Sequence, residues 1–151
     1  MLRSRVRRFL LQSLLFSMLL LGACADRNLP LLLSDAWVRT PPPGAAVAAG
    51  FVGLRNTDRA ALTIATVTAD VAGRAEIHDM EMQDGVMRMR QLTGGLTLAP
   101  GEQVLLAPGG KHVMLFDLQR RLRTGDAVQL RFHLADGREV SATLPVQDTA
   151  P

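Results

Sequence analysis

The sequence is short of cysteine: among its 151 residues it contains only Cys24. No disulfide can form within the chain, so a folded domain has to be held together by its apolar core. The chain also lacks an acid-rich loop and a cysteine pair, so neither a metal site built from carboxylates nor one built from thiolates is indicated. The length allows one domain of ordinary size in addition to a leader.

The chain after its first few residues has no excess of basic residues, although the whole sequence has a pI of about 10.4. Four of the 17 basic residues precede the first apolar run, which leaves 13 basic against 14 acidic residues. Without a basic stripe and interleaved aromatic residues, a nucleic-acid partner is not indicated. The basic start is typical of a targeting signal.

An apolar stretch from Phe9 to Ala23 follows these arginines. It is short for a bilayer-spanning helix, which needs about 20 apolar residues, and is typical of a signal-peptide core. The sequence Leu21-Gly22-Ala23-Cys24 resembles the lipobox of bacterial lipoproteins. We predict a lipoprotein signal peptide at 1–23, a tether at 24–34 and a membrane anchor through lipidated Cys24. The alternative is an A-x-A cleavage site at 23–25, which would release a soluble domain.

No window of a dozen residues beyond the leader carries the apolar period of a helix. The chain consists of short runs suited to strands, separated by turn formers such as Asp84-Gly85 and Asp136-Gly137. This spacing predicts an all-β fold, an antiparallel β-sandwich or barrel, in a single domain at 35–146 with a short tail at 147–151. The predicted strands lie at 36–38, 45–55, 61–71, 75–82, 86–92, 96–98, 103–107, 112–118, 127–134 and 139–144.

Methionine and histidine gather between residues 78 and 114. Alternate residues of a strand share a face, so three sets of these side chains each project together. The sets are His78, Met80 and Met82; Met87 and Met89; and His112 and Met114. Thioether and imidazole groups suit soft, monovalent copper. Methionines that fill gaps in a core are the alternative, which explains less well why two histidines are each followed by a methionine two residues later.

The same segments resemble the periplasmic copper chaperones of the PCu(A)C (PCuAC) family. The matching stretches are 36–39, 42–44, 71–74, 78–82, 85–90 and 108–115. The family pattern is a histidine, ten residues, a methionine, twenty-one residues and His-x-Met. Here ten residues separate His78 from Met89, whereas twenty-two separate Met89 from His112. We place the extra residue in a loop at Gly94-Gly95.

The resemblance implies a cupredoxin-like, antiparallel Greek-key β-sandwich that holds one Cu(I) ion at an exposed edge. The implied ligands are His78, Met89, His112 and Met114. Strand parity does not separate Met87 from Met89, and the family motif selects Met89. Met80, Met82 and Met87 are then expected to support the ligands or to pack beside them. The implied protein is a monomeric chaperone of the periplasm that delivers copper to an exported cuproprotein, with the binuclear copper centre of cytochrome c oxidase as acceptor.

Two other functions account for less of the sequence. A lipoprotein that binds another envelope protein would use its methionines as packing and would bury them. An enzyme is not expected, because the chain offers no nucleophile with a base partner and no paired catalytic carboxylates.

The remaining candidate residues have simpler interpretations. His133 is expected to face solvent. The cations of Arg88, Arg90 and Lys111 flank the predicted site, where they would steer an acidic acceptor or simply form a solvated face. Four aromatic residues are predicted to lie in the core: Trp37, Phe51, Phe116 and Phe132.

Overall fold

The computed structural model describes residues 29–151, which form ten strands without a helix. The predicted signal peptide and Cys24 lie outside the described residues. Within residues 29–151 there is accordingly no helix that could span a membrane. The strands are β1 (Leu31–Arg39), β2 (Val47–Asn56), β3 (Leu62–Ala69), β4 (Ala72–Gln83), β5 (Val86–Gln91), β6 (Leu96–Leu98), β7 (Gln103–Leu106), β8 (His112–Leu118), β9 (Ala127–Leu134) and β10 (Glu139–Gln147).

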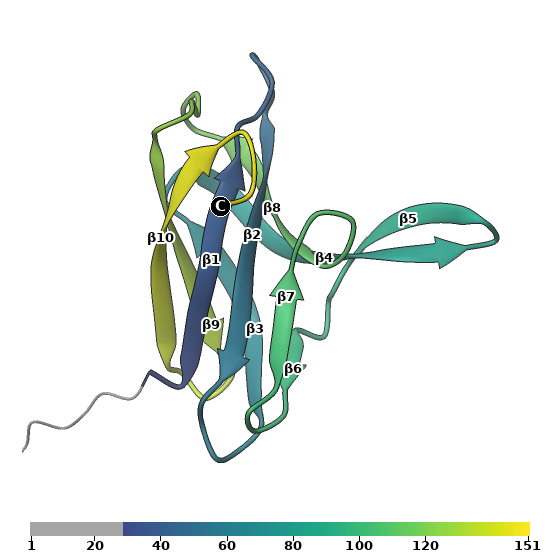
Figure 1. The fold of residues 1–151 in the computed structure, drawn as a ribbon, viewed down its shortest axis with the longest axis vertical. Coiled ribbons are helices and arrows are strands. Elements are labelled where there is room, and N and C mark those ends of the chain that lie inside the picture. The colour runs from purple at the N-terminus through teal and green to yellow at the C-terminus, as the bar shows by residue number, and fades with distance from the viewer. Residues whose placement is uncertain (1–28) are drawn as a thin grey trace, which may run out of the picture.

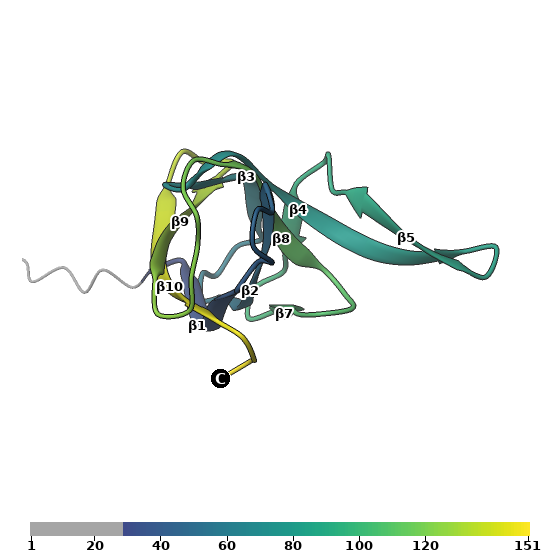
Figure 2. The same cartoon turned by 90° about the horizontal axis from the view of Figure 1, so that it is seen from above.

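The main strands wrap into a closed layer around one core (Figures 1 and 2). The order β4-β8-β2-β1-β10-β9-β3 returns to β4 through the pairing of Val67 with Ala75. Neighbouring strands are antiparallel except β1 and β10, which run parallel through Val38 and Val146. The predicted all-β, single-domain sandwich is therefore confirmed, and one parallel pair completes it.

Alternation of apolar and polar residues fixes which face of each strand is buried. In β9 the side chains of Val128, Leu130, Phe132 and Leu134 are buried, while the residues between them are wholly or partly exposed. Successive side chains of a strand point to opposite faces, so one side of each strand that closes the barrel faces the core. The side chains on the outer face of the barrel do not contribute to this core.

β1 begins earlier than the sequence pattern predicts. Residues 31–34, which we assigned to the tether, pair with residues 53–56 of β2. Leu31 is fully buried in the core, so burial of its side chain draws this segment into the barrel. A shift of register between Ser34 and Trp37 separates this part of β1 from the remainder.

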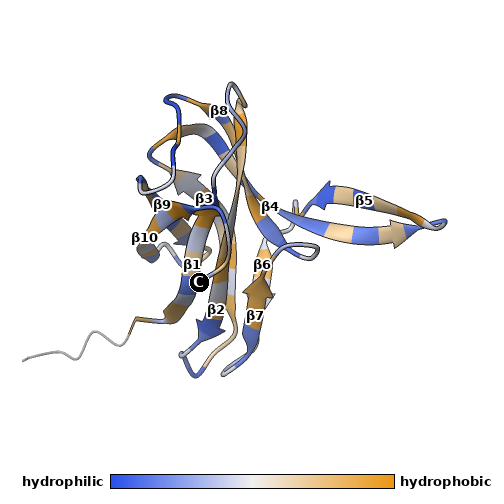
Figure 3. Cartoon of the chain, turned by 45° about the horizontal axis from the view of Figure 1, so that its top comes forward, coloured by the Kyte–Doolittle hydropathy of each residue, from blue (hydrophilic) through white to orange (hydrophobic). Residues whose placement is uncertain are grey.

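The β4–β5 hairpin projects from the barrel as an arm (Figures 1 and 3). We call residues 79–91 the hairpin arm. β4 pairs with β8 as far as His78, and from there outward its partner is β5. The connecting residues Asp84 and Gly85 have φ values of 51° and 77°, as expected for a two-residue type I′ turn. This turn fixes the register of the arm from Gln83 opposite Val86 to His78 opposite Gln91.

Candidate metal site

His78 and His112 are brought together at the base of the hairpin arm. They are direct cross-strand partners on β4 and β8, and their ring centroids lie 6.1 Å apart. The neighbouring Ile77 and Val113 are buried in the core, so both histidines occupy the outer face of the sheet. They are nevertheless shielded: His112 is 6% exposed.

Each imidazole has one nitrogen held by a hydrogen bond and one left for a ligand. His78 Nε2 donates to the Glu76 carboxylate at 2.7 Å, and His112 Nδ1 donates to the Gly110 carbonyl at 2.8 Å. Both acceptors lack a hydrogen, so the remaining lone pairs are on His78 Nδ1 and His112 Nε2. His78 Nδ1 is buried and has no hydrogen-bond partner among the described residues. An unsatisfied buried acceptor costs about 1–3 kcal/mol, which suits an atom that ligates an ion.

Glu76 orients His78 and was not among the predicted site residues. Hydrogen bonding to His78, and to a lesser degree to Arg74, keeps the pKa of the Glu76 carboxyl below its ordinary value. The group is therefore an anion at neutral pH, and it acts as an acceptor for His78. The sequence contained a signal for this role, since Glu76, His78 and Met80 alternate along one face of β4.

The register also places the methionines. Met114 lies opposite Glu76, one step along β8 from His112. On the hairpin arm Met89 lies opposite Met80, and Met87 lies opposite Met82 one step farther out. The partner of His78 on β5 is Gln91. Met89 is two residues from Gln91 on the same face of β5, and Met87 is four residues away. The geometry thus favours Met89 over Met87, which strand parity alone left equivalent, although it also brings Met80 beside His78.

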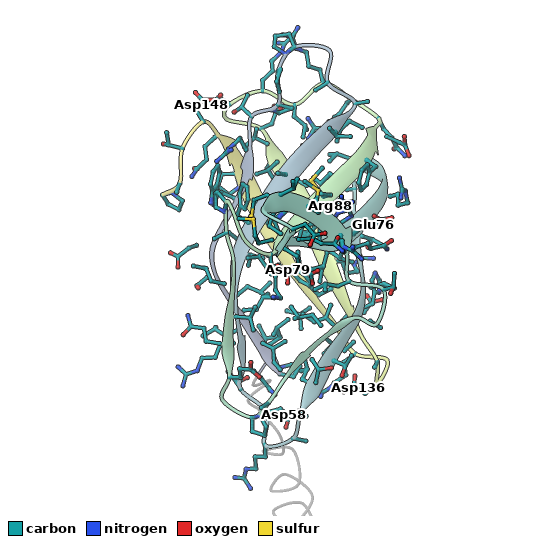
Figure 4. All side chains as sticks on the ribbon, turned by 90° about the vertical axis from the view of Figure 1, so that its right-hand side faces the viewer. Asp58, Glu76, Asp79, Arg88, Asp136 and Asp148 are labelled. Atoms are coloured by element: carbon teal, nitrogen blue, oxygen red, sulfur yellow. The ribbon has the colours of Figure 1, made fainter. Side chains whose placement is uncertain are left out.

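The other face of the hairpin arm carries charges. In the strand register Asp79 lies opposite Arg90 and Glu81 lies opposite Arg88, and all four positions alternate with the methionines. Lys111 Nζ lies 2.6 Å from Asp79 Oδ2, which ties the loop before β8 to the base of the arm. Figure 4 looks along the arm toward the barrel, with Glu76, Asp79 and Arg88 at its centre. The arm therefore has one charged face and one thioether face.

Aromatic rings flank the two histidines. Of the four aromatic residues predicted to lie in the core, Trp37, Phe51 and Phe132 are buried, whereas Phe116 is partly exposed. Phe132 is in that core, but Trp37, Phe51 and Phe116 lie on the outer face of the sheet. The Phe51 ring lies 6.5 Å from His112, and the Phe116 ring lies 5.8 Å from His78. The Trp37 ring packs against Phe51 at 4.7 Å. We call Trp37, Phe51 and Phe116 the outer aromatic cluster.

His133 is remote from this arrangement on the outer face of β9. It is partly exposed and bonds to Thr68 at 2.9 Å and to Glu139 at 2.8 Å. Across residues 29–151, no three side chains drawn from His, Cys, Asp and Glu are grouped so that they could hold a metal ion. The register instead places methionine positions next to the histidine pair, with Met80 and Met89 on one side and Met114 on the other.

Comparisons with known proteins identify the family. The chain matches the family model described as "Putative lipoprotein LpqE-like" over residues 31–146. It is 28% identical over 116 residues to "Putative lipoprotein Lxx21020" of Leifsonia xyli subsp. xyli, which covers 77% of this chain and 69% of that protein. The fold is similar to a copper-bound PCuAC domain from PmoF2, with a TM-score of 0.64, 21% identity and coverage of 81% and 94% of the two chains.

It is also similar to the solution structure of CuI-DR1885 from Deinococcus radiodurans, with a TM-score of 0.55 and 23% identity. That likeness covers 83% of this chain and 84% of the other. These structures confirm the fold, and the family match extends over nearly all the described residues. The chain belongs to the LpqE-like family, and its fold is that of the PCuAC domains.

Proposed function

We propose that this protein is an exported copper chaperone that binds one Cu(I) ion and transfers it to another exported protein. Its ligands are His78, Met89, His112 and Met114, at the base of the hairpin arm. Lipidated Cys24 anchors it to the membrane facing the periplasm, where it acts as a monomer. Its acceptor is the binuclear copper centre of cytochrome c oxidase.

The observation that carries this proposal is the histidine pair. The buried His112 imidazole and the largely shielded His78 imidazole stand side by side with one free lone pair each, and the His78 lone pair has no partner within the described residues. A metal–imidazole bond is about 2.0 Å long, so rings whose centroids are 6.1 Å apart can contact one ion. The fixed hydrogen bonds at Glu76 and Gly110 orient the rings for this purpose.

The methionines supply the soft part of the ligand set. Thioethers bind Cu(I) without releasing a proton, and they cannot form disulfides in an oxidising compartment. Met89 is about half exposed, so an acceptor can approach the ion from the side of the hairpin arm. Ligands of the acceptor protein can then replace the thioethers one at a time. This ligand exchange transfers the ion to the acceptor without an enzymatic step.

The relatives support the choice of ion and of location. Two of the similar structures are of a copper-bound and a Cu(I)-bound protein, and the Leifsonia relative is described as a putative lipoprotein. Packing within this chain is a poorer explanation of the methionines, because Met82, Met87 and Met89 are 65%, 46% and 48% exposed. A pure interaction module would be expected to bury them in its own fold.

The proposal is tested by copper transfer from the purified protein. The chain is loaded with one equivalent of Cu(I), and X-ray absorption is expected to report two nitrogen and two sulfur ligands. The loaded protein is then mixed with the apo copper domain of cytochrome c oxidase, the two are separated, and copper is measured in each. Retention of all the copper by this chain would contradict delivery to that acceptor, and an oxygen-rich coordination sphere would contradict the ligand set.

Replacing Glu76 with glutamine is expected to weaken Cu(I) binding by about 10-fold, because the neutral amide holds His78 less firmly and lowers its basicity. Competition with a Cu(I) chelator measures the change. Glu81→Gln is the matched control, since Glu81 is exposed on the charged face of the arm. If the two variants bind Cu(I) equally well, Glu76 does not orient His78 for the ion.

A further inference from the structure

The outer half of the hairpin arm carries more methionine than a single copper site uses. Met82 and Met87 form one direct cross-strand pair, and Met80 and Met89 form the next pair toward the barrel. All four side chains share the face on which His78 lies. The proposed inner site takes only Met89 from this group.

These methionines do not contribute to the core. β5 is an edge strand that pairs with β4 alone, and the arm extends away from the barrel (Figure 2). Met82 and Met87 are 65% and 46% exposed. Coloured by hydropathy, the two strands of the arm show alternating polar and apolar bands rather than an apolar patch covered by other elements (Figure 3).

The chemistry of this face is selective. Directly opposed residues of an antiparallel pair have Cβ atoms about 4.5–5.5 Å apart, and the long, unbranched methionine side chain is flexible. Three neighbouring sulfur atoms can therefore turn toward a common point. The carboxylates of Asp79 and Glu81 are on the other face, so an ion that requires oxygen ligands finds none here.

We propose that Met80, Met82 and Met87 form a second metal site, an all-thioether site for a soft monovalent ion such as Cu(I). Neutral sulfur ligands favour this ion over zinc, magnesium or calcium. The site lies farther out on the arm than the histidine pair and is more exposed to solvent. It does not require the inner site to be formed, so the two can be tested separately.

The test is a titration with Ag(I), a closed-shell ion with the same preference for sulfur, followed by NMR of the methionine methyl groups. The wild-type protein is expected to bind two equivalents, the second of which shifts the methyl signals of Met80, Met82 and Met87. A triple variant, Met80→Leu, Met82→Leu and Met87→Leu, is expected to bind only one. Leucine keeps a similar apolar volume without sulfur, so the hairpin is preserved.

In the titrations of the wild type and the triple variant, two results would overturn the proposal: a single equivalent bound by the wild type, or a second equivalent retained by the triple variant. A His112→Ala, Met114→Ala variant separates this outcome from failure of the inner site. It is expected to lose the first equivalent and to keep the one that shifts Met82 and Met87. If the outer methyl signals stop responding in this variant, the arm does not hold an ion by itself.

Discussion

A His112→Ala, Met114→Ala double variant is expected to bind Cu(I) at least about 100-fold more weakly than the wild type. Loss of a group that merely supports a metal ligand typically costs 10–100-fold, so loss of two ligands should reach or exceed the upper end of that range. His112 is also the partner of His78, whose free nitrogen would be left without the second imidazole. The affinities are measured by competition with a Cu(I) chelator at fixed pH.

Folding has to be separated from binding in this experiment, because His112 is buried. Urea unfolding and circular dichroism show whether the double variant remains folded, and Met114→Leu provides a milder change that keeps an apolar side chain. His133→Ala is the matched control, since it removes a histidine from the outer face far from the site. Equal Cu(I) affinity in the wild type and the folded double variant would reject the assignment of His112 and Met114.

The hairpin arm is the part of the site that local sequence determines. Its strands alternate methionine with charged residues, and Asp84-Gly85 supplies the positive φ values of a tight turn. A two-residue turn allows only one pairing register between β4 and β5. The sequence therefore predicts that Met80, Met82, Met87 and Met89 share one face of the hairpin arm. The strand positions could be predicted for the same reason, because turn formers separate nearly all of them.

The pairing of β4 with β8 could not be predicted from local pattern. It depends on the closure of the whole barrel, which sets β8 beside β4 and His112 opposite His78. The hydrogen bonds that select the free nitrogen atoms depend on the same closure, because the Gly110 carbonyl comes from the loop before β8. The family resemblance supplied this combination of histidines, but not Glu76.

The position of the outer aromatic cluster could not be predicted from the sequence, because a buried apolar residue can lie on either face of the sheet. Trp37 and Val38 are adjacent and both buried, as are Phe51 and Val52. One residue of each pair enters the core, and the other lies on the outer face. There the guanidinium of Arg39 lies 5.6 Å from the Trp37 ring centroid and 5.4 Å from that of Phe51. Consecutive buried residues on two paired strands therefore indicate a second, smaller cluster outside the barrel.

Phe51→Ala is expected to lower the free energy of unfolding by about 3–5 kcal/mol, the usual loss for a buried phenylalanine. Phe51 is 4% exposed and contacts Trp37 on one side and His112 on the other. The cavity left by alanine removes the packing that holds the His112 ring, so Cu(I) affinity is also expected to fall, by about 10-fold. Urea unfolding measures the first effect, and chelator competition under native conditions measures the second.

Phe132→Ala distinguishes support of the site from general stability. Phe132 is fully buried in the main core, and its removal is expected to cost a similar 3–5 kcal/mol. Its ring belongs to β9, which does not pair with β4, β5 or β8, so the folded variant should bind Cu(I) as tightly as the wild type. Both variants must be compared in conditions where they are folded, because an ion that binds only the native state raises apparent stability. If Phe51→Ala and Phe132→Ala bind Cu(I) equally tightly, the outer aromatic cluster stabilises the barrel without holding His112 in position for the ion.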